Sequence, residues 1–148
     1  MDAVEAIARE QIRETLASYN HSGDRGRLEE LVACFTPDGV LEIAGEEPAR
    51  GRDAIRQRLT SVVADTVKAA AAPLVRHHVS STRIELAGDA EARVWSYFFV
   101  ITEVGPDHWG RYVDHFRRTG NAWLIAHRRV VTEGASPNAR MGSDPART

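Results

Sequence analysis

Four stretches with the apolar pattern of β-strands follow one another in the second half of the chain. They span residues 74–86, 90–104, 109–119 and 123–132. The turn sequences between them suit hairpins, and they are Gly88-Asp89, Gly105-Pro106-Asp107 and Gly120-Asn121. Strands joined in this way form an antiparallel meander, which must bury one of its faces. The cover for that face has to come from the first half of the chain.

Three helical patterns precede these strands, with apolar residues at helical spacing over residues 3–20, 28–35 and 53–70. A short strand is expected at 40–43. The fold class is therefore α+β: three N-terminal helices packed in a curved, mostly antiparallel β-sheet, which forms a cone with an internal pocket. We expect one domain over residues 1–133. Residues 134–148, rich in Gly, Ser, Pro and Ala, are expected to be a flexible C-terminal tail.

Composition narrows the function classes. The chain has 148 residues and a net charge of −2, from 19 basic and 21 acidic residues, so the sequence predicts neither a nucleic acid nor a membrane partner. The single Cys34 lies in an apolar helical pattern, which is typical of a buried thiol in a reducing compartment. Neither a signal peptide pattern nor an apolar run of 18 residues is present, and we expect a cytoplasmic protein.

Alternation along the strands suggests which side chains face the pocket. In residues 74–86 one face carries His78 and Ser80 between apolar ends, as expected of a pocket wall, and His77 falls on the opposite face. The next strand is bulky on both faces, with Phe98 on one of them. Helices would cover one side and a second subunit the other, which predicts a homodimer or homotrimer through the outer sheet face. The facing of Tyr112 on the third strand stays open.

A polar hinge joins the first two helical patterns. Within six residues it holds a phenol, an imidazole and a carboxylate, from Tyr19, His21 and Asp24. We expect these groups to meet the polar strand positions inside one pocket. Structural alternatives remain open: core packing for Tyr19, a solvent or capping role for His21, and a turn carboxylate bonded to backbone for Asp24.

The order of these motifs resembles the SnoaL-like branch of the cystatin-like α+β cone superfamily, which includes scytalone dehydratase, ketosteroid isomerase and nuclear transport factor 2. The resemblance covers roughly residues 5–132. The segments that carry it are 12–21, 24–26, 31–39, 51–55, 77–78, 110–114 and 120–128. It implies the cone fold, and it leaves the activity open, because the superfamily contains lyases, isomerases, cyclases and proteins that only bind a ligand.

The resemblance also implies a catalytic Asp–His pair, at positions that correspond here to Asp24 and His78. Such a pair can remove a proton beside a carbonyl or a leaving group. Scytalone dehydratase has a tyrosine where this chain has Gly23, and its second catalytic histidine falls near Thr102-Glu103, where this chain has none. Dehydration of that particular substrate is therefore not expected.

The hypothesis is a lyase (dehydratase type), isomerase or cyclase that works without a cofactor on an apolar small molecule, polycyclic compounds included. Asp24 and His78 would be catalytic. The residues expected to contact the substrate are Tyr19, His21, Ser80, Phe98 and Tyr112. No metal is expected, since the six histidines lack the spacing of ligand pairs. The alternatives are a non-catalytic binding or regulatory module, and an accessory subunit like the β subunit of ring-hydroxylating dioxygenases.

Overall fold

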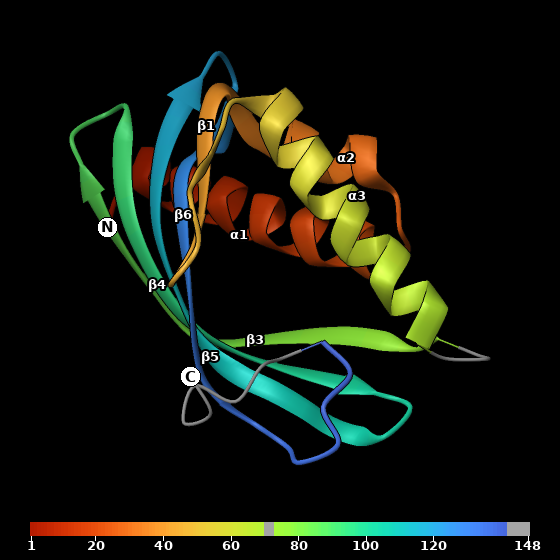
Figure 1. Ribbon diagram of the computed structural model, residues 1–148. Helices are drawn as coiled ribbons and strands as arrows, with labels where there is room; N and C mark the ends of the chain where they lie inside the picture. Colours follow the sequence, from red (N-terminus) through yellow and green to blue (C-terminus); the bar gives the residue numbers. More distant parts are fainter. Residues whose placement is uncertain (70–72, 142–148) are drawn as a thin grey trace.

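The computed structural model describes residues 1–69 and 73–141. Its sheet has six strands in the order β2-β1-β6-β5-β4-β3, antiparallel except for the β1–β6 pair. Figure 1 shows the curved sheet with α1 in its hollow and α2 and α3 beside α1. The expected α+β cone is confirmed. The elements are α1 Ala3–Asp24, α2 Leu28–Ala33, β1 Phe35–Ile43, β2 Ala49–Arg50, α3 Arg52–Ala69, β3 Val75–Ala87, β4 Glu91–Thr102, β5 Gly105–Thr119 and β6 Ala122–Ala135.

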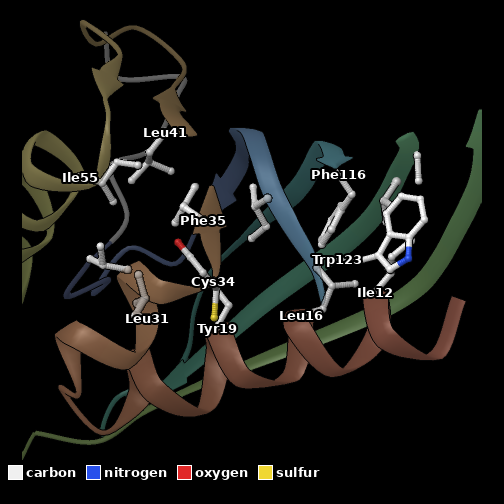
Figure 2. Packing of buried hydrophobic residues seen from close by; sticks show 14 of the residues in the cluster. Ile12, Leu16, Tyr19, Leu31, Cys34, Phe35, Leu41, Ile55, Phe116 and Trp123 are labelled. Atoms are coloured by element: carbon white, nitrogen blue, oxygen red, sulfur yellow. The ribbon is translucent and has the colours of Figure 1, made fainter. Parts of the chain in front are cut away.

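Helix α1 forms the centre of the core. Its first turn is capped by the Asp2 side chain, which accepts a hydrogen bond from the backbone N–H of Glu5 at 2.9 Å. The buried stripe of Ile12, Leu16 and Tyr19 faces the sheet (Figure 2). The helix runs four residues beyond its expected end at residue 20, so Asp24 lies in the last helical turn rather than in a loop.

The buried cysteine is confirmed. Cys34 is 6% exposed and lies among the apolar side chains between α1 and the sheet (Figure 2). Burial raises the pKa of its thiol to about 11, against the opposing effect of Arg128 and Arg52. The thiol is therefore protonated near neutral pH and packs as a small apolar group.

A β-bulge in β3 decides which side chains enter the cone. The pairing of β3 with β4 shifts between Ser80 and Arg83, and Ser81 has a φ of 51°. An extra residue in one strand moves all side chains beyond it to the other face. The inward set is therefore Val75, His77 and Val79 before the bulge, then Thr82, Ile84 and Leu86 after it. The predicted facing is wrong for the first half of this strand, where His78 and Ser80 are exposed.

A second irregularity, in β6, brings a charge into the core. The β5–β6 register shifts between His115 and Phe116, which pair with His127 and Ile125. The residue left over is Ala126, so that Ile125 and Arg128 are both fully buried. Strict alternation would have placed them on opposite faces.

The β4–β5 connection differs from the expected one. The turn consists of Glu103 and Val104, whereas Gly105-Pro106-Asp107 already belongs to β5. The predicted turn at Gly120-Asn121 is confirmed.

The segment after residue 133 is built into the fold as far as residue 141. Strand β6 ends at Ala135, two residues beyond the predicted domain boundary, and the chain then folds back onto β5. The Ser136 N–H donates to the Asp107 carbonyl at 2.7 Å, and the Met141 N–H donates to Asp107 Oδ1 at 3.1 Å. Met141 packs against the buried cluster of Phe98, Val100 and Tyr112. The rest of the predicted tail, 142–148, lies outside the described residues.

Candidate functional site

An aspartate and a histidine meet where the end of α1 approaches β3. Asp24 Oδ1 lies 2.6 Å from His77 Nδ1, and the His77 backbone N–H donates to both carboxylate oxygens at 3.2 and 3.0 Å. The side chains are 10% and 19% exposed. Because a carboxylate only accepts hydrogen bonds, in the neutral ring this contact places the proton on Nδ1 and the lone pair on Nε2. His77 therefore has the tautomer of a general base.

The predicted partner of Asp24 is corrected from His78 to His77. His78 is exposed on the outer side of β3, where its ring stacks on Phe99 with centroids 4.6 Å apart and planes 8° apart. The reason is the bulge at Ser81, which reverses the facing of residues 75–80. The adjacent His77-His78 pair was visible in the sequence, but only the register of the strand decides between the two.

A cavity of about 340 Å³ lies beside Asp24 and His77. Its volume falls in the lower part of the range typical of small-molecule sites. Its apolar wall comes from α1, α2, α3, β3 and the C-terminal segment. The residues of that wall include Leu28, Leu31, Leu59, Val62, Val63, Val75 and Met141. Such a wall favours an apolar ligand.

Of the five residues expected to contact a substrate, three are buried and two are exposed. Tyr19 lines the cavity, and burial raises the pKa of its hydroxyl despite the nearby Arg128 guanidinium. Phe98 and Tyr112 are buried inside the cone and stack on each other with centroids 4.6 Å apart. His21 and Ser80 are exposed instead, although His21 also lines a hollow between α1 and β3 that includes Asp24 and His77.

A buried ion pair lies deeper in the cone. Arg128 donates from Nε and Nη2 to the two carboxylate oxygens of Asp114 at 2.9 and 2.7 Å, and neither side chain has any exposed area. The guanidinium lies between the rings of Tyr19 and Tyr112, at 4.2 and 4.1 Å from their centroids. This geometry orients Tyr19, which lines the cavity.

A second Asp–His pair, which the sequence analysis missed, lies on the same face of the sheet. His77 is opposite Val100, and Val100 is opposite His108. His108 Nδ1 lies 2.8 Å from Oδ1 of Asp107, whose carboxylate is fully buried. The backbone N–H groups of the C-terminal segment also donate to this carboxylate. The signal was an Asp–His dipeptide, masked by its turn-like Gly-Pro context.

The pair gives a pH-dependent stability. Burial lowers the pKa of His108 below its ordinary 6.5, and His77 adds to that effect while Asp107 opposes it. The unfolded chain therefore binds more protons at this site below pH 6.5, and stability falls as the pH drops through that window. We expect His108→Gln to lose less stability than the wild type between pH 7.5 and 5.5, by at most about 1.4 kcal/mol per pH unit.

Urea unfolding at the two pH values measures this difference. Asp107 does not confound it: although burial opposes the shift, hydrogen bonds from Arg140, His108 and Met141 leave its pKa below the ordinary 3.8. The stability that the ionised Asp107 carboxylate contributes is therefore lost only at a pH below the measured range. Equal losses in His108→Gln and the wild type would show that His108 is not the group responsible.

Two further properties concern only the part of the chain that the structure describes. No helix there is both long and apolar enough to cross a bilayer. No three His, Cys, Asp or Glu side chains there come together in the manner of a metal site.

The fold and the Asp24–His77 pair, called the dyad from here on, define a class: an α+β cone protein with an Asp–His pair at an apolar cavity. The chain belongs to the SnoaL-like domain family, whose model matches residues 4–129. The comparison with curated proteins finds no match.

Solved structures share the fold. A scytalone dehydratase-like protein from Novosphingobium aromaticivorans is similar over 100% of this chain and 99% of its own, with 23% identity and a TM-score of 0.81. ActVI-ORFA from Streptomyces coelicolor has 21% identity and a TM-score of 0.73, with 84% and 96% of the chains covered. A protein from Catenulispora acidiphila, in complex with S-DNPA, has 26% identity, a TM-score of 0.74 and coverage of 86% and 94%.

Proposed function

We propose that this protein is an enzyme that removes a proton from a small, largely apolar substrate without a cofactor, as a lyase, isomerase or cyclase does. The observation that carries the proposal is the Asp24–His77 contact at the wall of the apolar cavity. Likeness to a scytalone dehydratase-like protein and to a protein crystallised with a small molecule supports it.

The chemistry follows from the tautomer. Nε2 of His77 takes the proton from a carbon next to a carbonyl or a leaving group, and the ring becomes an imidazolium. The electron pair of the broken C–H bond forms a carbon–carbon double bond, either as an enolate or with departure of the leaving group. The Asp24 carboxylate stabilises the imidazolium at Nδ1. In an isomerase the same proton returns to another carbon.

Hydrogen exchange tests this proposal without knowledge of the natural substrate. We would incubate the protein in D₂O with a panel of one- and two-ring ketones, such as 2-tetralone, and follow deuterium incorporation next to the carbonyl by NMR. The expected result is exchange above the buffer rate with the wild type and its loss in Asp24→Asn. Ketones that bind, seen as shifts of cavity resonances, but never exchange faster would instead favour a binding module.

We also propose that the outer face of the sheet joins two copies of the chain. The aromatic side chains of Tyr97, Phe99 and Trp109 are 58%, 42% and 41% exposed, on adjacent strands β4 and β5. A cluster of this kind on central strands is typical of a subunit contact. A second copy would present the same apolar face, so the contact can be self-complementary.

We expect Trp109→Glu to turn the dimer into a monomer, because it places a charge in the middle of this contact. Light scattering after size exclusion measures the mass. The matched control is Val4→Glu, at an exposed apolar position on α1, which should stay dimeric. A wild type that is monomeric at about 100 μM, a concentration at which even weak specific dimers form, would rule out this interface.

A further inference from the structure

A second hollow borders the dyad, between α1 and the edge strand β3. These two elements are in contact. The hollow measures about 460 Å³. Four residues line both this groove and the apolar cavity: Asn20, Asp24, Arg25 and His77. The dyad therefore stands where an arginine-lined groove and an apolar cavity meet.

The groove carries an excess of positive charge. Three of its lining residues are arginines, Arg13, Arg25 and Arg76, and one is acidic, Asp24, which leaves two positive charges unbalanced within the lining. This is notable in a chain whose net charge is −2. The Asp24 carboxylate is already engaged with His77, so it does not neutralise the arginines by direct contact.

Among the residues that the structure describes, these arginines have few partners. Arg13 has one weak contact, 3.7 Å to Glu10 on the same helix. Arg25 Nη1 lies 3.1 Å from His21 Nδ1, and Arg76 Nη1 donates to the neighbouring Val75 carbonyl at 2.7 Å. In none of these contacts does the guanidinium donate two parallel hydrogen bonds, as it does to a carboxylate. Most of their donor capacity remains for a ligand.

A buried polar atom that lacks a partner among the described residues lies at the same place. Oδ1 of Asn20 is buried and has no hydrogen-bond partner in the described part of the chain. Asn20 lines both hollows, next to the dyad. A carboxylate has no proton to donate to this oxygen, so Oδ1 of Asn20 takes no part in the binding proposed below.

We propose that the substrate is an organic acid with an apolar body: its carboxylate binds the arginines of the groove, and its apolar part fills the cavity. The carbon that loses the proton would then lie at the junction, beside His77. This inference rests on the proposed function, whose cavity and base it uses, and it adds the charge that the substrate carries. The groove sets the orientation of the acid, because the carboxylate of the acid fits the groove and its apolar part fits the cavity.

A matched pair of probes tests the charge requirement. We would measure the binding of 2-naphthoate and of its neutral amide, 2-naphthamide, by calorimetry at low salt. The wild type should bind the acid roughly 10-fold more tightly, an advantage of the size that a few exposed charge contacts provide. The advantage should shrink at 0.5 M salt, because exposed charges are screened.

Two variants connect the preference to the groove. The double variant Arg13→Gln/Arg76→Gln should bring the two affinities to within about twofold, since most of the groove charge is gone. The control is Arg83→Gln, which removes an exposed arginine of β3 that pairs with Glu85 outside the groove, and it should keep the wild-type preference. An unchanged preference in the double variant would overturn the proposal.

The outcomes separate this inference from the proposed function. Equal binding of acid and amide overturns the groove proposal and leaves an apolar cavity with its base. Failure of both probes to bind contradicts the cavity itself, and the two proposals fall together.

Discussion

Replacing His77 by Gln lowers kcat/KM for proton abstraction by roughly 10²–10⁴-fold, the range that a positioned general base supplies. Glutamine keeps a polar group near Asp24, but it has no basic nitrogen at the position of Nε2. The replacement of His78 by Gln changes the rate by less than about tenfold. His78 borders the arginine-lined groove, but its ring stacks on Phe99 and does not contact Asp24. The rates are measured on whichever ketone of the exchange assay the wild type turns over best.

The two histidines form a matched pair of positions, neighbours in sequence and on the same strand. Long-range ¹H–¹⁵N NMR gives a second readout that does not depend on turnover. In the wild type the proton of the neutral His77 ring should be on Nδ1, and Asp24→Asn should shift the population towards the Nε2–H tautomer. A large rate loss in His78→Gln with a small one in His77→Gln would contradict the assigned dyad.

The architecture could be predicted from the sequence because it depends on period and turn chemistry. The stripe of Ile12, Leu16 and Tyr19 defines α1, and Gly120-Asn121 defines the last hairpin. Apolar periodicity extends over many residues of each helix and strand, so an error at one position does not change the predicted element. The end of α1 was predicted four residues too early, because Gly23, which is typical of a break, lies here within the last helical turn.

The site was harder to predict because it depends on single-residue register. Asp24 was identified, but its partner was not. A bulge between the histidines and Ile84 decides whether His77 or His78 shares the inward face with Ile84. The bulge falls in Ser80-Ser81-Thr82, where Ser81 adopts a positive φ without the glycine that would announce it. A slip of one residue exchanges the two faces, so His77 and His78 exchanged roles. A one-residue register shift in β6 likewise places Arg128 in the core.

The Asp107–His108 pair was missed for a related reason. Pro106 and Asp107 are typical turn residues, yet here they lie in the first part of β5. The Asp107 carboxylate is buried because the C-terminal segment folds over it and donates two backbone N–H groups. That contact joins residues more than thirty positions apart, and local pattern carries no information about it.

The second large effect is expected in the buried ion pair. Replacing Arg128 by Met leaves the Asp114 carboxylate buried without its countercharge, and it removes the guanidinium from between Tyr19 and Tyr112. Breaking one side of a buried pair typically costs about 3–5 kcal/mol. Because Tyr19 lines the cavity, we expect weaker ligand binding as well. Urea unfolding followed by Trp fluorescence measures the free energy of unfolding.

A double variant separates charge from packing in this loss. Arg128→Met/Asp114→Leu removes both charges, and it should recover much of the stability, because two apolar side chains need no desolvated partner. Arg56→Ala, which breaks an ion pair with Glu29 at the surface, should cost no more than about 1 kcal/mol. If the double variant is as unstable as Arg128→Met, the stacking of Arg128 between the two tyrosines, and not its pairing with Asp114, holds this part of the cone together.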